Sequence, residues 1–136
     1  MRGILCISHG HFAEAFTGSL KMIAGPVTNL HYCCLEPTDG PAEFGAKLEA
    51  LEPELAKYDN VLVFADLFGG SPCNTTFSRF FQNPKMEFIA GMNFPMVLTA
   101  ILNEEMDVDT LIAQGQEGIV DVKKFNAMMM SSDDED

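Results

Sequence analysis

Short, mostly apolar runs alternate along this chain with longer segments whose apolar residues recur at helical spacing. The short runs cover residues 3–8, 29–35, 61–65 and 86–90, and the continuous apolarity of the first, which ends at Ser8, is typical of a strand buried on both faces. Helical spacing covers residues 10–24, 42–58, 73–81, 94–102 and 107–116. The alternation predicts a doubly wound α/β fold, with a mainly parallel central sheet and helices on both faces.

The end of the chain does not follow this alternation of strand and helix patterns. We expect residues 118–122 to form a last short strand, which makes residues 1–122 one domain. The chain then closes with MMMSSDDED, in which no packing pattern is visible. We therefore expect residues 123–136 to form a flexible acidic tail.

A histidine and an aspartate follow two strands of the predicted sheet. His9 comes after the first strand, and Asp66 comes after the third. In doubly wound sheets, ligands bind beyond the carboxyl ends of the strands, where the strand order reverses. In the common order 2-1-3-4 the first and third strands are neighbours, so we expect His9 and Asp66 to face each other.

Such a pair has a clear chemical use. The carboxylate accepts a hydrogen bond from one ring nitrogen, and the other nitrogen keeps a lone pair that attacks an electrophile or binds a metal. We expect Gly10 to open one helix, and Gly69-Gly70 to open another with Ser71 as its N-cap. Backbone N–H groups at both helix starts, together with the Ser71 hydroxyl, favour a phosphoryl group on His9 that needs no metal and no cofactor.

Plainer interpretations of the same residues exist. A histidine at the end of a strand is often only a turn residue, and a glycine pair marks turns of many kinds. His11 is expected to lie exposed on the first turn of a helix, and a metal site built from His9 and His11 lacks a third ligand nearby. The chain also has no phosphate-binding G-x-x-x-x-G-K-[ST] loop, so nucleotide hydrolysis is not indicated.

Composition narrows the class of protein. The 136 residues carry a formal net charge of −12, four charges of which belong to residues 133–136. This acidity argues against nucleic-acid binding and suits either basic partner surfaces or simple solubility. The four cysteines form no C-x-x-C pair, and no secretory signal or long apolar span is visible. We therefore expect a cytoplasmic protein with reduced, buried thiols.

Three motifs in order resemble one known family. ISHGHFAEA, VFADLFGGSPCN and EFIAGMNFPM are together similar to the enzyme IIA component of the mannose/fructose/sorbose branch of the bacterial sugar phosphotransferase system (PTS). The resemblance spans nearly the whole chain, from residue 3 to about residue 122. It implies that His9 is the phosphoryl acceptor, that Asp66 orients it, and that Ser71 helps to hold the phosphate.

The resemblance also implies partners. A IIA component of this family accepts its phosphoryl group from the phosphocarrier HPr and passes it to enzyme IIB, which phosphorylates sugar entering through the membrane proteins IIC and IID. No IIB sequence follows here, so IIB is expected on a separate chain. Members are typically homodimers that exchange a last antiparallel strand, for which residues 118–122 are our candidate. We expect an apolar docking rim at Phe12, Leu67, Phe68 and Met92, although Phe12 fits core packing equally well.

Two other functions remain open at this stage. Domains of this kind also occur within transcriptional regulators, where phosphorylation acts as a signal, so a regulatory binding module is the main alternative. A metal-dependent enzyme that uses His9, His11 and Asp66 is a third possibility, and stoichiometric metal would reveal it.

Overall fold

Four parallel strands form the centre of the molecule in our computed structural model, which describes residues 1–134. They are β1 (Arg2–His9), β2 (Leu30–Leu35), β3 (Asn60–Ala65) and β4 (Met86–Ala90), arranged in the order β2-β1-β3-β4. The sequence prediction of a parallel sheet in the order 2-1-3-4 is therefore confirmed.

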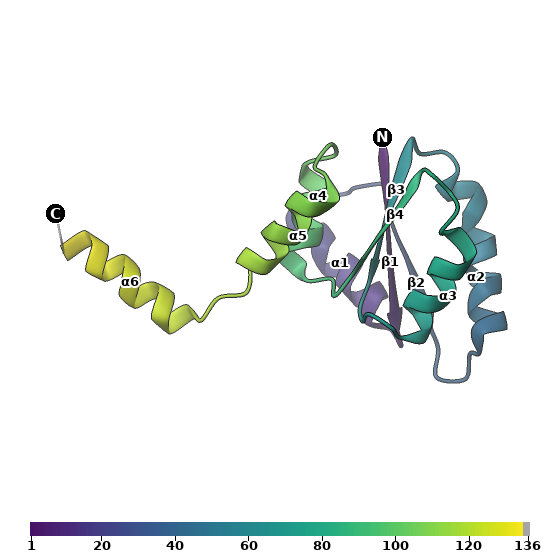
Figure 1. Ribbon diagram of the computed structural model, residues 1–136, viewed down its shortest axis with the longest axis horizontal. Helices are drawn as coiled ribbons and strands as arrows, with labels where there is room; N and C mark the ends of the chain where they lie inside the picture. The colour runs from purple at the N-terminus through teal and green to yellow at the C-terminus, as the bar shows by residue number, and fades with distance from the viewer. Residues whose placement is uncertain (135–136) are drawn as a thin grey trace.

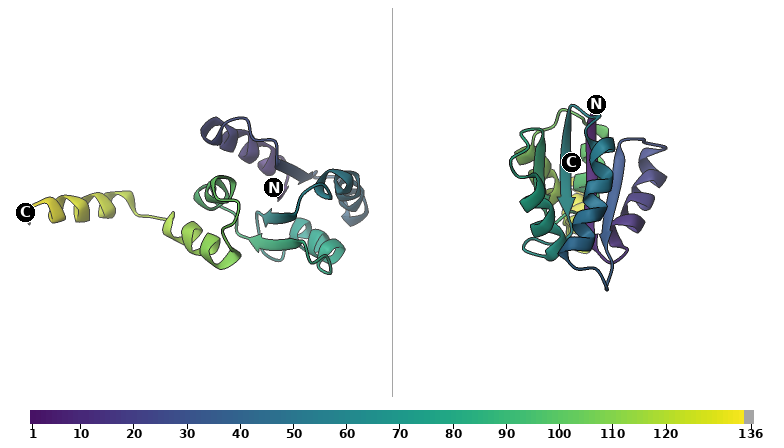
Figure 2. Two further views of the ribbon diagram at one scale, coloured as in Figure 1. Left: turned by 90° about the horizontal axis from the view of Figure 1, so that it is seen from above. Right: turned by 90° about the vertical axis from the view of Figure 1, so that its right-hand side faces the viewer.

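Helices cover both faces of this sheet. Along the chain they are α1 (Phe12–Ala24), α2 (Pro41–Leu55), α3 (Ser71–Phe80), α4 (Phe94–Leu102) and α5 (Val108–Glu117). α2 and α3 pack together on one face, whereas α1, α4 and α5 cover the other (Figures 1 and 2). The doubly wound arrangement is confirmed. Among residues 1–134, no helix is long and apolar enough to cross a membrane.

The two-sided core explains why the central strands β1 and β3 are nearly continuous apolar runs in the sequence. Successive residues of β1 point to opposite faces. Ile4 and Cys6 join the apolar cluster beneath α1, α4 and α5, and Leu5 and Ile7 join the cluster beneath α2 and α3. All four side chains are buried, which explains why residues 4–7 of the strand are apolar.

The strand register brings the predicted site residues to one edge. Ile7 of β1 lies opposite Ala65 of β3, and the backbone N–H of Asp66 continues the ladder by donating to the carbonyl of Ile7 at 3.1 Å. His9 is the last residue of β1. Both side chains therefore emerge at the carboxyl edge of the sheet, from its two central strands.

The chain end differs from the prediction. Residues 118–121 form a turn and coil instead of a strand, and a sixth helix, α6, runs from Val122 to Asp134. Asp121 starts this helix, because its carboxylate accepts the N–H of Lys124 at 3.1 Å and its carbonyl accepts the N–H of Phe125 at 2.9 Å. The apolar residues at 118–122 predict a strand, but the cap from Asp121 favours a helix from Val122 onward.

α6 extends away from the body of the molecule (Figure 1). Its apolar side chains are exposed along its length. Most of the segment expected as a flexible acidic tail is thus helical, and residues 135–136 lie outside the described residues. Strand exchange between two copies stays a prediction, because a single chain does not test it.

Candidate functional site

His9 and Asp66 meet at the carboxyl edge of the sheet. Nδ1 of His9 lies 2.9 Å from Oδ2 of Asp66, and the same oxygen accepts the backbone N–H of His9, also at 2.9 Å. One carboxylate oxygen therefore holds both the main chain and the ring of the histidine. The facing pair that strand topology predicted is present.

The contact with Asp66 distinguishes the two ring nitrogens of His9. When Nδ1 carries the proton and donates it to Asp66, Nε2 keeps an unshared electron pair. The His9 side chain is 47% exposed and the Asp66 side chain 17% exposed, so the histidine is accessible while its partner is largely covered. Within the described residues, Oδ1 of Asp66 is buried without a hydrogen-bond partner.

Nε2 of His9 lies beside the start of α3. A Cβ atom placed on Gly70 would lie only 2.7 Å from Cε1 and 3.3 Å from Nε2 of His9. Gly70 is the N-cap of α3, where we had expected Ser71, and Ser71 is the first helical residue. The first N–H groups of a helix have no acceptor within it and carry partial positive charge. The ring nitrogen that does not contact Asp66 therefore lies beside a helix start whose partial positive charge favours an anion.

Gly69 shapes the loop that leads into α3. Its φ of +81° lies in the left-handed region that favours glycine. The side-chain amide of Asn74 donates to the Gly69 carbonyl at 3.0 Å and fastens the loop to the first turn of the helix. Asn74 has a supporting role that sequence reasoning missed, since an asparagine inside a helical segment gives no signal of the residue it will bond.

Gly10 has a different role from the one predicted. It turns the chain with φ +57°, but its N–H donates to the carbonyl of Leu35 at 2.7 Å, so this amide is already engaged. α1 begins two residues later, at Phe12, with His11 as its N-cap. Gly10 therefore precedes α1 instead of opening it, and its own N–H has an acceptor at the end of β2.

Ser8 is a second residue that sequence reasoning missed. Its fully buried hydroxyl accepts the N–H of Ala13 at 2.7 Å and donates to the carbonyl of Gly10 at 3.3 Å. Ser8 thus caps α1 from inside the sheet and fixes the turn that carries His9. The sequence shows a polar residue at the end of an apolar run, but it does not show which groups that residue bonds.

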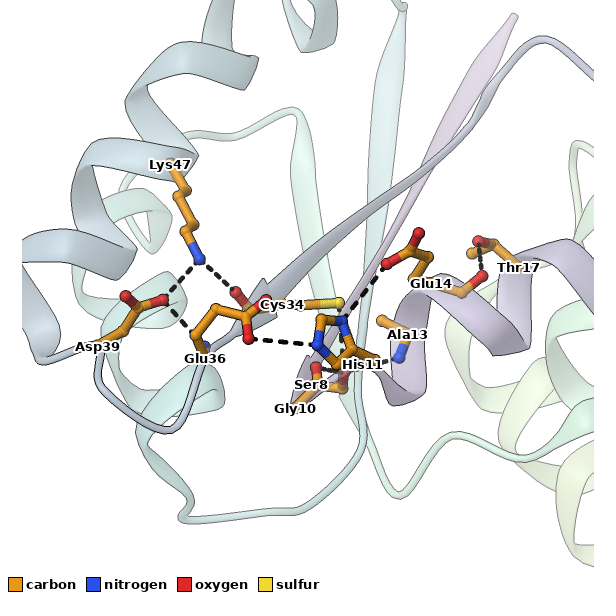
Figure 3. Close-up of polar contacts among 10 residues, drawn as sticks. All are labelled: Ser8, Gly10, His11, Ala13, Glu14, Thr17, Cys34, Glu36, Asp39 and Lys47. Atoms are coloured by element: carbon orange, nitrogen blue, oxygen red, sulfur yellow. Dashed lines mark hydrogen bonds and ion pairs between the residues drawn. The ribbon is translucent and has the colours of Figure 1, made fainter.

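The ring of His11 lies between two glutamates rather than beside Asp66. Its Nδ1 is 3.5 Å from Oε2 of Glu14, and its Nε2 is 3.3 Å from Oε2 of Glu36 (Figure 3). The carboxylates approach opposite nitrogens of the ring. Within residues 1–134, no group of three or more His, Cys, Asp or Glu side chains is arranged to hold a metal ion.

The loop that carries Glu36 is held by Lys47. Its ammonium group donates to Asp39 at 2.6 Å and to the carbonyl of Cys34 at 3.1 Å, and Asp39 also accepts the N–H of Glu36 (Figure 3). The hydrogen bond from Lys47 lowers the pKa of Asp39, and the same bond raises the pKa of Lys47. At neutral pH this ion pair therefore stabilises the loop that carries Glu36.

The four residues expected to form a docking rim divide in two. Phe68 is 84% exposed, and Leu67 and Phe12 are each more than half exposed. Phe12 also stacks on Phe16, with ring centroids 5.6 Å apart. Met92 is buried in the core with 7% exposure, so its expected place on the rim is wrong. Its position after β4 turns the side chain inward, beneath α4 and α5.

Comparison with known proteins points to one family. A family model described as the PTS system fructose IIA component matches residues 3–115. The sorbose-specific EIIA component of Lacticaseibacillus casei is 32% identical over 112 residues, which are 81% of this chain and 80% of that protein. The fructose-specific EIIA component of Bacillus subtilis is 27% identical over 113 residues, covering 82% of this chain and 77% of that one.

Solved structures show the same likeness. The crystal structure of the PTS IIA protein associated with the fucose utilization operon of Streptococcus pneumoniae aligns with a TM-score of 0.84 and 29% identity, covering 90% of this chain and 94% of that one. The family match covers well over half of the sequence and includes every element that builds the site. The chain therefore belongs to the PTS fructose IIA family and is an EIIA component of the sugar phosphotransferase system.

Proposed function

We propose that this protein is a phosphocarrier that accepts a phosphoryl group from phospho-HPr on Nε2 of His9 and passes it to enzyme IIB. One observation carries the proposal. Asp66 engages Nδ1 of His9 at 2.9 Å, while Nε2 lies beside the first turn of α3. This geometry supports a nucleophilic nitrogen that acts beside an anion-binding helix start.

The transfer needs positioning more than acid–base chemistry. The lone pair of Nε2 attacks phosphorus, and the P–N bond to the donor histidine breaks with its electron pair returning to the donor ring. His9 gains positive charge as the new P–N bond forms, and the Asp66 carboxylate offsets that charge. In this proposal the backbone N–H groups of Gly69, Gly70 and Ser71, with the Ser71 hydroxyl, bind the phosphoryl oxygens.

The proposal extends to partners. Exposed Phe68, Leu67 and Phe12 form an apolar rim for HPr and IIB, and the net charge of −12 suits partners with basic surfaces. The IIB partner is proposed to be a separate chain, and sugar enters through the IIC and IID proteins. We place the relay in the cytoplasm, at the membrane permease complex, with residues 1–122 as the phosphocarrier domain of a homodimer.

Labelling tests the proposal directly. The purified protein is incubated with phosphoenolpyruvate, enzyme I and HPr, and the phosphorylated residue is found by mass spectrometry under neutral conditions. The chain has three histidines, so His9→Ala, His11→Ala and His31→Ala form a matched set. We expect an acid-labile phosphoryl group in every protein except His9→Ala.

Two results would contradict this assignment. Retained labelling in His9→Ala would move the acceptor elsewhere. Attachment of the phosphoryl group to Nδ1, shown by nitrogen NMR of the labelled protein, would contradict the role given to Asp66.

A further inference from the structure

We propose that Gly70 is a positioning residue for His9, because the absence of a side chain there lets the imidazole ring lie against the start of α3. The inference rests on the proposed function, since it deepens the account of the same site. It gives Gly70 a role that is separate from any backbone contact with phosphate.

The backbone of Gly70 does not itself require glycine. Its φ of −78° and ψ of 164° are extended values that any residue adopts. The neighbouring glycine offers a contrast, because Gly69 has φ +81°, yet a Cβ atom placed on it would meet nothing within 4 Å. Conformation thus explains the glycine at position 69 and leaves the glycine at position 70 unexplained.

The ring of His9 supplies the explanation. A Cβ atom on Gly70 would lie 2.7 Å from Cε1 and 3.3 Å from Nε2 of His9, with Leu67 Cδ2 next at 3.7 Å. A carbon–carbon distance of 2.7 Å is far inside the 3.5–4.0 Å of ordinary contact. Any side chain at position 70 therefore displaces the imidazole ring before it meets another group.

The ring is held on two sides. Asp66 holds the Nδ1 side through a 2.9 Å contact, and the bare α-carbon of Gly70 bounds the Cε1–Nε2 side. Because the His9 side chain is 47% exposed, it can swing outward without disturbing the core. A methyl group at position 70 should thus leave the fold intact while moving Nε2 away from α3 and loosening the bond to Asp66.

The test compares Gly70→Ala with Gly18→Ala, an exposed helical glycine whose Cβ would meet nothing within 4 Å. Both variants are assayed for kcat and KM with phospho-HPr, for thermal unfolding, and for the imidazole signals of His9 by proton–nitrogen NMR. For Gly70→Ala we expect kcat to fall about 10²-fold with KM changed less than about threefold. Its unfolding midpoint should shift by less than about 3 °C.

The NMR readout separates positioning from structure. We expect a changed Cε1–H shift and a weakened Nδ1–H signal in Gly70→Ala, and wild-type signals and turnover in Gly18→Ala. In the wild type, a nuclear Overhauser contact between the Gly70 Hα protons and the His9 Hε1 proton should be strong. This last measurement needs no variant, so it tests the contact even where Gly70→Ala folds poorly.

Unchanged imidazole signals in Gly70→Ala, or a missing Overhauser contact in the wild type, would overturn the inference. The proposed function fails in a different way, through a wild-type protein that HPr does not phosphorylate. If HPr does not phosphorylate the wild type but Gly70→Ala still shifts the imidazole signals of His9, Gly70 positions His9 for another function.

Discussion

Oδ2 of Asp66 accepts two hydrogen bonds from His9, one from its backbone N–H and one from its ring, each at 2.9 Å. The aspartate therefore fixes where the strand ends as well as how the imidazole is turned. In the proposed phosphoryl transfer, its negative charge also stabilises the imidazole ring as that ring becomes positive.

Replacing Asp66 with asparagine keeps the shape and removes the charge. We expect Asp66→Asn to lower the rate of phosphoryl transfer from phospho-HPr by at least about 10²-fold, because tautomer and charge stabilisation are both lost. Rapid-quench kinetics measures the rate, and thermal unfolding should show little loss of fold. Asp109→Asn, at an exposed aspartate of α5, is the matched control. Equal rates in both variants would remove Asp66 from the mechanism.

Ser8→Ala tests the buried cap of α1. The hydroxyl of Ser8 is the acceptor for the Ala13 N–H at 2.7 Å, and its loss leaves that donor buried without a partner. We expect the free energy of unfolding in urea to fall by about 1–2 kcal/mol. The exposed Ser19 of the same helix gives the comparison, with a change within about 0.5 kcal/mol for Ser19→Ala. A neutral Ser8→Ala would show that the cap does not contribute to stability.

The lowered pKa of His31 predicts how the free energy of unfolding depends on pH. Burial lowers the pKa of His31 below its usual 6.5, and its Nε2 lies 2.6 Å from the hydroxyl of Tyr58. Below pH 6.5 the unfolded chain takes up a proton at His31 more readily than the folded chain does. The stabilising contribution is therefore complete above pH 6.5 and is lost as the pH falls toward the lowered pKa.

The measurement compares wild type with His31→Gln by urea unfolding between about pH 8 and pH 5. We expect the stability advantage of the wild type to shrink over this range, since glutamine does not titrate. His11→Gln serves as the control for a histidine at the exposed surface. Parallel pH profiles for wild type and His31→Gln would rule out His31 as the source of the dependence.

Phe68→Ala addresses the docking rim. Phe68 is 84% exposed, so removing its ring costs little stability, and it lies in the loop between Asp66 and α3. We expect KM for phospho-HPr to rise about tenfold while kcat stays within about threefold, because rim contacts act before the chemical step. Met22→Ala is the control, as Met22 is 87% exposed near the far end of α1. An unchanged KM would place the docking surface elsewhere.

Those parts of the molecule that depend on pattern and topology could be predicted from the sequence. Apolar runs located the four strands, and the strand order brought His9 and Asp66 together. These features follow from burial and chain direction, which composition along the chain encodes.

Other features depend on which groups contact or hydrogen-bond each other, and only the three-dimensional structure shows these partners. The N–H of Gly10 donates to the carbonyl of Leu35, a partner from another strand that no sequence pattern indicates. Gly70 appeared interchangeable with Gly69, although one contacts the His9 ring and the other turns the chain. At residues 118–122 the apolar residues fitted a strand, and the cap from Asp121 favoured a helix further on.

Gly3→Ala tests a close approach at the opposite end of β1. A Cβ atom there would overlap Cδ2 of Tyr58 and lie 2.8 Å from Cγ of the same ring, which is held by the bond between its hydroxyl and His31. We expect a loss of about 1–3 kcal/mol in the free energy of unfolding, because the ring must leave its place. Gly18→Ala, in open space on α1, should instead gain about 0.5–1 kcal/mol. Repeating Gly3→Ala in a Tyr58→Ala background should abolish most of the loss, and an equal loss in both backgrounds would assign the glycine to the backbone rather than to the ring.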